Sequence, residues 1–257
     1  MQCQGDKYMK KTFLEYDNPL LVSMVQADNP DRIKELIDKS IPDGAEAFGM
    51  QLCRLKPEFR NTRTYNDIFS YSDMPTYVTN YRYGYNEGKT DEQLGEELLE
   101  IAKCGPTLCD IMGDLYDKHP DELTVDKQAA DKQIDLINRL RQKGVEVLMS
   151  SHIYRFTPAE RVLEIALEHQ KRGADISKIV TGAETMEQQI ENIKIANLLK
   201  QNLKIPFLFL STGESRILRK IGGELGSCMY LCVCEHDEFS TPAQPLLKNV
   251  KAIRDNM

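Results

Sequence analysis

The predicted fold is decided by two stretches, Val145-Glu-Val-Leu-Met-Ser-Ser-His152 and Asp175-Ile-Ser-Lys-Ile-Val180. Each is a short apolar run of the kind that forms a buried parallel strand. Residues 157–171, which lie between them, begin with Thr157-Pro158 and predict a helix. A strand–helix–strand unit of this size implies a right-handed crossover between neighbouring parallel strands. We therefore expect His152 and Lys178 on adjacent or nearly adjacent strands, facing a common interior.

The same alternation of strands and helices runs along most of the chain. Six further strands are predicted at residues 20–26, 44–53, 75–82, 107–112, 206–212 and 228–234. Further helices are predicted near residues 29–38, 90–103, 134–140, 186–199, 216–225 and 244–255, and a loop with a short helix at residues 56–73. Eight strands alternating with helices predict an α/β protein with one (β/α)8 TIM-barrel domain over residues 20–257, after a polar tail at residues 1–19. An open doubly wound sheet is the alternative, although its glycine fingerprint does not follow the first strand.

The composition excludes several classes of partner. The net charge of -7 over 257 residues argues against a nucleic-acid partner. No apolar run approaches the roughly 20 residues that span a bilayer, and residues 1–11 contain no apolar signal region. The seven cysteines, an odd number, predict free thiols in a reducing cytoplasm. Cys232, Cys234 and His236 lack a second pair of ligands with zinc spacing, so we expect no metal site.

Lys178 is a lysine inside an apolar strand. Burial disfavours its charged form and so favours the neutral, nucleophilic amine. A neutral amine can attack a ketone and form an imine, which withdraws electrons from the adjacent carbon. The alternative is that Lys178 points outward and extends its ammonium group to solvent between helices.

His152 ends its predicted strand beside Ser150 and Ser151, and a barrel has its active site at this end of the strands. An imidazole there can remove a proton next to an iminium carbon and later protonate a departing hydroxyl. The alternative is a structural histidine at a strand end, whose ring nitrogens are hydrogen-bonded but have no catalytic role.

Two later segments offer groups that can bind a substrate. Arg219 follows the seventh predicted strand, where its guanidinium can hold a carboxylate through two hydrogen bonds; the alternative is a solvated helix charge. Ser240-Thr-Pro-Ala-Gln244 follows the eighth strand and reads as a mobile loop with two uncharged hydrogen-bonding side chains, or simply as a polar turn.

Together these segments resemble the type I 3-dehydroquinate dehydratases, the Schiff-base barrel enzymes of the shikimate pathway. The resemblance is specific from about Val145 to the C-terminus. Four segments carry it: Ser150-Ser-His152 with Thr157-Pro158, Asp175-Ile-Ser-Lys178-Ile, Arg219 through Gly226-Ser227, and Ser240-Thr-Pro-Ala-Gln244.

The N-terminal half departs from the family pattern. Gly49 and Gln51 stand where the second strand of the family ends in a Glu-x-Arg pair that contacts substrate hydroxyls. On the fourth strand Asp110 matches the family, whereas Met112 occupies a place usually held by an acidic residue. The resemblance thus implies an intact catalytic half and an altered hydroxyl-recognition half.

The third predicted strand and the loop after it each have one position that resembles a family site residue. Arg82 is the equivalent of the family arginine at the end of this strand, although the spacing from Pro75 is one residue longer than usual. Glu87, followed by Gly88, is similar to the family's loop glutamate, so the resemblance implies that Glu87 orients the catalytic histidine.

The resemblance implies dehydration of 3-dehydroquinate to 3-dehydroshikimate. Lys178 would form the imine, His152 would act as base and then as acid, Arg219 would hold the carboxylate, and Ser240 and Gln244 would close over it. The expected partner is a small carboxylated ketone, without metal or organic cofactor and without nucleic acid or membrane. The family's usual homodimer and a cytoplasmic location are expected as well.

Two alternatives remain open at this point. Loss of the Glu/Arg pair removes partners of substrate hydroxyls, which fits a divergent Schiff-base lyase or aldolase-like enzyme acting on another carboxylated carbonyl compound. A catalytically silent ligand-binding barrel is the other alternative, since a fold does not determine a function.

Overall fold

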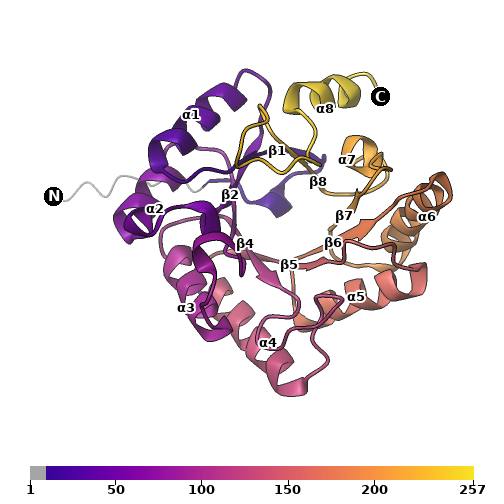
Figure 1. Ribbon diagram of the computed structural model, residues 1–257, viewed down its shortest axis with the longest axis horizontal. Coiled ribbons are helices and arrows are strands. Elements are labelled where there is room, and N and C mark those ends of the chain that lie inside the picture. Colours follow the sequence, from indigo (N-terminus) through magenta and orange to yellow (C-terminus); the bar gives the residue numbers. More distant parts are fainter. Residues whose placement is uncertain (1–9) are drawn as a thin grey trace.

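The computed structural model of this protein describes residues 10–257, and the core of the molecule is one eight-stranded parallel sheet. The strand order is β7-β6-β5-β4-β3-β2-β1-β8, and the two end strands approach each other at an isolated parallel bridge between Phe207 and Ser227. The sheet therefore curls into a (β/α)8 barrel with the helices outside it (Figure 1). This confirms the predicted barrel and excludes the open doubly wound sheet.

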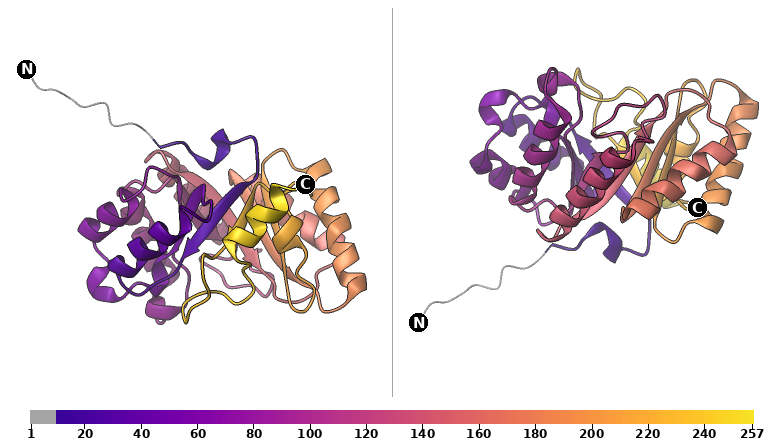
Figure 2. Two further views of the ribbon diagram at one scale, coloured as in Figure 1. Left: turned by 90° about the horizontal axis from the view of Figure 1, so that it is seen from above. Right: turned by 90° about the horizontal axis from the view of Figure 1, so that it is seen from below.

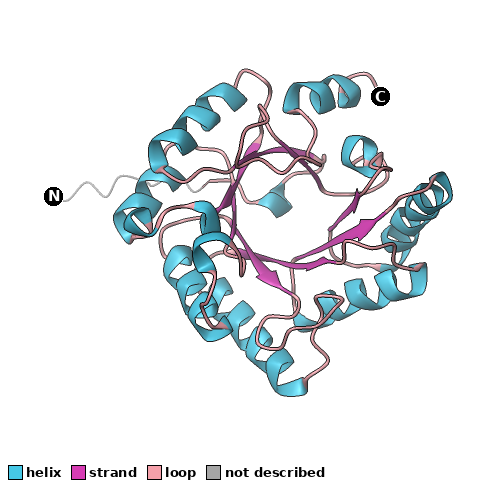
Figure 3. Ribbon diagram, viewed as in Figure 1, coloured by secondary structure: helices cyan, strands magenta, loops and turns pink. Residues whose placement is uncertain are grey.

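The strands form the inner ring that Figure 3 shows in magenta. They are β1 (Leu20–Val25), β2 (Ala47–Gln51), β3 (Thr76–Thr79), β4 (Leu108–Met112), β5 (Glu146–His152), β6 (Ile176–Gly182), β7 (Phe207–Thr212) and β8 (Met229–Cys232).

The outer layer consists of one helix after each strand. These helices are α1 (Pro30–Ser40), α2 (Thr62–Phe69), α3 (Asp91–Ala102), α4 (Lys127–Arg141), α5 (Ala159–Arg172), α6 (Met186–Asn202), α7 (Leu218–Ile221) and α8 (Leu247–Arg254). Short 3-10 turns are η1 (Phe13–Glu15), η2 (Leu52–Arg54), η3 (Pro57–Phe59) and η4 (Gly84–Asn86). Among the helices of residues 10–257, none combines the length and the apolar composition that a membrane-spanning segment needs.

The interior of the barrel is filled by alternate side chains of the strands, because successive side chains of a strand point to opposite faces. Its apolar layers include Val22, Leu108, Leu148, Ile176 and Leu208, all almost fully buried. The other faces of the strands pack against the helices. The part of the barrel near the N-terminal ends of the strands is thus a solid core. A cavity can open only at the C-terminal ends of the strands, the mouth of the barrel.

Part of the segment predicted as a polar tail belongs to this core. Phe13 in η1 is 6% exposed and meets the ring of Tyr77 edge-on, with 6.5 Å between ring centroids. Its backbone nitrogen donates to the Glu146 carboxylate at 2.9 Å. Figure 2 shows η1 at the end of the barrel opposite the yellow loop that precedes α8. η1 therefore closes the N-terminal end of the barrel; the signal-region prediction falls mainly on residues 1–9, outside the described residues.

The predicted elements are found in order, with differences in length. The helix predicted at residues 216–225 shortens to the four residues of α7, because the backbone turns at Gly222 and Gly223 toward β8. The strand predicted at residues 75–82 is assigned only over Thr76–Thr79. The short helix expected within residues 56–73 is α2, which spans eight residues.

Candidate active site

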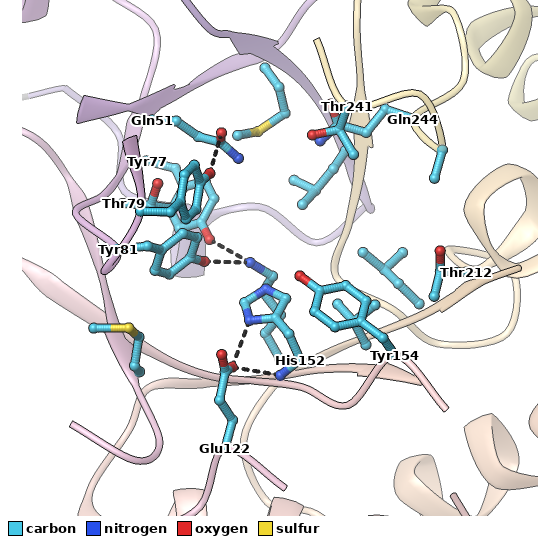
Figure 4. Close-up of a pocket in the computed structure, with 18 of the residues that line it drawn as sticks. Gln51, Tyr77, Thr79, Tyr81, Glu122, His152, Tyr154, Thr212, Thr241 and Gln244 are labelled. Atoms are coloured by element: carbon cyan, nitrogen blue, oxygen red, sulfur yellow. Dashed lines mark hydrogen bonds and ion pairs between the residues drawn. The ribbon is translucent and has the colours of Figure 1, made fainter. Parts of the chain in front are cut away.

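One cavity of about 400 Å³ opens at the C-terminal mouth of the barrel (Figure 4). All eight strands contribute to its wall, as expected for a barrel enzyme. The strand residues that line it are Met24, Gln51, Tyr77, Thr79, Met112, His152, Lys178, Val180, Leu210, Thr212 and Leu231. Its volume suits a small organic ligand.

Lys178 points into the barrel from the middle of β6, as predicted, and is 4% exposed. Its Nζ donates to the hydroxyls of Tyr77 at 3.0 Å and Tyr81 at 2.8 Å, and lies 3.3 Å from Oδ2 of Asp110. Burial lowers the pKa of Lys178 below its ordinary value, and the charge of Asp110 opposes this shift. The neutral amine needed for imine formation is therefore populated to a greater extent than on a surface lysine.

Asp110 lies beneath the lysine with no exposed side-chain surface. Its carboxylate accepts hydrogen bonds from Ser150 Oγ at 2.6 Å, from Tyr81 Oη at 2.5 Å and from Tyr77 Oη. Burial disfavours its charge, but Lys178 and these donors hold the pKa of Asp110 below its usual value. Burial and Asp110 raise the pKa of both tyrosines well above the ordinary value, so they stay protonated as donors.

His152 ends β5 on the strand next to Lys178, because Ser150 is in register with Lys178 and His152 with Val180. Its Nδ1 lies 2.8 Å from Oε2 of Glu122, and this oxygen also accepts its backbone N–H at 2.6 Å. The imidazole meets the ring of Tyr81 edge-on at 5.3 Å and stacks on Tyr154 at 6.1 Å. A carboxylate and two aromatic rings thus fix the orientation of the histidine (Figure 4).

Arg219 lines the cavity from α7, after β7, and is 7% exposed. Its Nε donates to the carbonyl of Ser211 at 2.7 Å, and no carboxylate of residues 10–257 lies within 4.0 Å of its guanidinium. Burial, with the positive charge of Arg216, lowers the pKa of Arg219 to about 10. A buried, protonated guanidinium without an anionic neighbour is suited to bind a ligand carboxylate.

The loop after β8 contributes Gln244, as predicted, and Thr241. The Oε1 of Gln244 accepts from Nε2 of Gln26 at 3.2 Å, and both loop residues line the cavity. Ser240 does not line it. Its Oγ donates to the carbonyl of Asp237 at 2.9 Å, so the hydroxyl is used in a local turn.

The prediction that Glu87 orients the histidine is wrong for this structure. Glu87 is exposed, does not line the cavity, and makes no hydrogen bond or ion pair with His152. Glu122, in the loop between β4 and α4, takes that position with a left-handed backbone at φ 45°. Little in the sequence points to Glu122 as the partner of His152, because the conformation of the loop determines which carboxylate reaches the barrel mouth.

Arg82 lies at the cavity wall, but its guanidinium is already engaged. It donates to Asp91 at 2.7 and 2.8 Å, and to the side chain and carbonyl of Asp114 at 2.6 and 2.7 Å. Tyr77 and Thr79 of β3 point inward, and Tyr81, two residues after the strand, continues their period-two pattern, whereas Arg82 does not. Tyr81, rather than Arg82, therefore reaches Lys178. In the sequence, only the period-two pattern of inward-facing residues points to Tyr81.

The residues at and near the end of β2 form one part of the cavity wall. Gln51 lines the cavity, and its Oε1 accepts from the hydroxyl of Tyr83 at 2.7 Å. A Cβ on Gly49 would clash with Sδ of Met24. The Met24 thioether thus fills the space next to Gly49.

Residues 88–256 match the family described as Type I 3-dehydroquinase. Among curated proteins, the chain is 26% identical over 238 residues to a bifunctional 3-dehydroquinate dehydratase/shikimate dehydrogenase of Arabidopsis thaliana, covering 91% of this chain and 36% of the relative. It is 30% identical over 115 residues to the 3-dehydroquinate dehydratase of Geobacillus thermodenitrificans, covering 44% of each. Each match therefore spans less than half of the curated relative.

Solved structures show the same fold over nearly the whole chain. The type I 3-dehydroquinate dehydratase of Clostridium difficile, with covalent modified comenic acid, superposes with a TM-score of 0.77 at 16% identity, covering 94% of this chain and 93% of the other. The 3-dehydroquinate dehydratase of Geobacillus kaustophilus superposes with a TM-score of 0.78 at 15% identity, covering 93% and 91%.

Proposed function

The chain belongs to the type I 3-dehydroquinase family, and from this premise we propose that it is a Schiff-base-forming 3-dehydroquinate dehydratase of the shikimate pathway. In this reaction 3-dehydroquinate loses water to give 3-dehydroshikimate. One observation carries the proposal: Lys178 and His152 extend from adjacent strands into one cavity that Arg219 also lines. An amine, a base and a carboxylate-binding cation are the groups that this elimination requires.

We assign the amine chemistry to Lys178. Its neutral Nζ attacks the ketone carbon, and loss of water from the adduct leaves a protonated imine that acts as electron sink. The hydroxyls of Tyr77 and Tyr81, at 3.0 and 2.8 Å from Nζ, are near enough to pass protons during this step. Hydrolysis of the product imine later consumes one water and returns the amine.

The proton transfers of the elimination are assigned to His152. With Nδ1 engaged by Glu122, the lone pair of Nε2 can take the proton from the carbon next to the imine. The resulting imidazolium then donates that proton to the departing hydroxyl. Arg219 holds the substrate carboxylate, Gln244 and Thr241 cover it, and Gln51 contacts the ring oxygens.

A second candidate keeps the imine chemistry on another substrate. Gly49, Met24 and Met112 provide no carboxylate on the wall where the family binds hydroxyls. A divergent Schiff-base lyase acting on a less hydroxylated keto acid fits this apolar wall.

We further propose that the protein is a homodimer and that it lies in the cytoplasm. Light scattering tests the dimer. The free thiols of Cys53, Cys109 and Cys232 support the cytoplasmic location.

The test of the proposed function is turnover of 3-dehydroquinate, followed by the ultraviolet absorbance of the conjugated enone product. Wild type should produce the absorbance, and Lys178→Ala should not. A silent wild-type protein that folds normally would reject 3-dehydroquinate as the substrate and leave the divergent lyase as the better assignment.

A further inference from the structure

A second arginine, Arg54, lines the cavity. Arg54 ends η2, directly after β2, and is half-buried. Among residues 10–257, no carboxylate lies within 4.0 Å of its guanidinium, and its buried Nε has no hydrogen-bond partner. A guanidinium that is partly removed from water and unpaired gains strongly from an anion.

Tyr83 holds Arg54 against the wall. The Arg54 guanidinium carbon lies 5.4 Å from the centre of the Tyr83 ring, and the Tyr83 hydroxyl donates to Gln51 at 2.7 Å. Stacking on a ring leaves the N–H edge of a guanidinium available for a ligand. Arg54 is thus positioned by its neighbours without being neutralised by them.

The charges that line the cavity are unbalanced. The cations are Arg54, Arg82, Lys178 and Arg219, whereas Glu122 is the one carboxylate among the lining residues that the structure describes. Asp91 and Asp114 neutralise Arg82, and Asp110 lies beneath Lys178. Glu122 is engaged by His152. Within residues 10–257, two guanidinium groups that line the cavity therefore remain unpaired, one after β2 and one after β7.

We propose that Arg54 is a second anion-binding residue, through which the cavity also accepts a ketone with two acidic groups. Arg219 holds one group and Arg54 the other, while the apolar side chains of Met24, Leu210 and Leu231 contact the carbon skeleton between them. The inference goes beyond the proposed function, because 3-dehydroquinate has a single carboxylate. It predicts that a dicarboxylate ketone binds more tightly than its monocarboxylate counterpart.

Two matched cyclic ketones provide the test: 3-oxocyclohexane-1-carboxylate and 5-oxocyclohexane-1,3-dicarboxylate. Isothermal titration calorimetry gives the dissociation constant of each whether or not an imine forms. In wild type we expect the dicarboxylate to bind about tenfold or more tightly. Arg54→Gln should abolish this preference and leave the monocarboxylate unchanged, with Arg54→Lys in between.

The controls separate this inference from loss of folding and from the proposed function. Arg63→Gln removes an exposed arginine outside the cavity and should keep the preference. Circular dichroism and the thermal midpoint verify that each variant folds. Equal affinities in wild type, no binding of the dicarboxylate, or an unchanged preference in Arg54→Gln would each overturn the role of Arg54. Turnover of 3-dehydroquinate, measured in parallel, decides the proposed function independently.

Discussion

One carboxylate oxygen of Glu122 accepts two hydrogen bonds from His152, at 2.6 Å from its backbone nitrogen and at 2.8 Å from Nδ1. An ionised carboxylate at Nδ1 keeps the ring proton on that nitrogen and leaves Nε2 as the acceptor. The base function of His152 therefore depends on a loop residue that lies 30 positions earlier in the chain.

Glu122→Gln should impair the proton transfers without changing the cavity shape. An amide supports the required tautomer less well than a carboxylate does, so we expect kcat to fall by about 10- to 100-fold with a small change in KM. Glu87→Gln is the matched control and should retain wild-type kinetics, because Glu87 is exposed outside the cavity. The reverse result, in which only Glu87→Gln loses activity, would contradict the assignment.

Tyr81→Phe should slow imine formation. The variant loses the acceptor 2.8 Å from Lys178 Nζ and a donor to Asp110. We expect the rate of borohydride-trapped adduct formation to fall by about tenfold, while the affinity governed by Arg219 changes little. Tyr85→Phe, an exposed tyrosine outside the cavity, is the control. A raised KM with an unaltered trapping rate would assign Tyr81 to substrate binding instead.

Stability should depend on pH through His169, which is fully buried behind β5 and β6. Its ring nitrogens lie 3.1 Å from Ser151 Oγ and 3.0 Å from Ser177 Oγ, and burial lowers its pKa to about 3. The unfolded chain takes up this proton below about pH 6.5, whereas the folded chain does not, so the stabilisation is present above that pH and is lost as pH falls.

His169→Gln removes this titration while an amide can still contact both serines. Between pH 6.5 and 5, we expect the wild-type free energy of unfolding to decrease by about 2 kcal/mol more than that of the variant. Urea unfolding at the two pH values measures the difference. Parallel pH dependences of the two proteins would show that His169 is protonated in the folded state.

The barrel and the pairing of Lys178 with His152 could be predicted because both follow from local pattern. Apolar strands alternating with amphipathic helices determine the topology, and a crossover unit places the ends of its two strands side by side. Arg219 could be predicted for the same reason, since it follows the end of a strand by a short segment. The depressed pKa of Lys178 follows from its place in an apolar strand.

The partners of these groups could not be predicted, because each depends on a distance between remote segments. Glu122 reaches His152 only through the conformation of residues 113–126, including its own left-handed backbone. Arg82 matches the family arginine only with a spacing from Pro75 that is one residue longer than usual, and the structure places it after β3, paired with Asp91 and Asp114. Arg54 could be identified as a site residue only from the structure, because only the structure shows which cations that line the cavity have no anionic partner among residues 10–257.

The most direct test of the central claim is to trap the imine on Lys178. Sodium borohydride reduces a protonated imine to a stable secondary amine, so the protein is treated with borohydride and 3-dehydroquinate and its peptides are analysed by mass spectrometry. We predict added ligand mass on the peptide that contains Lys178 in wild type, and none in Lys178→Ala. Turnover of 3-dehydroquinate without an adduct at Lys178, or with the adduct on another lysine, would contradict the account.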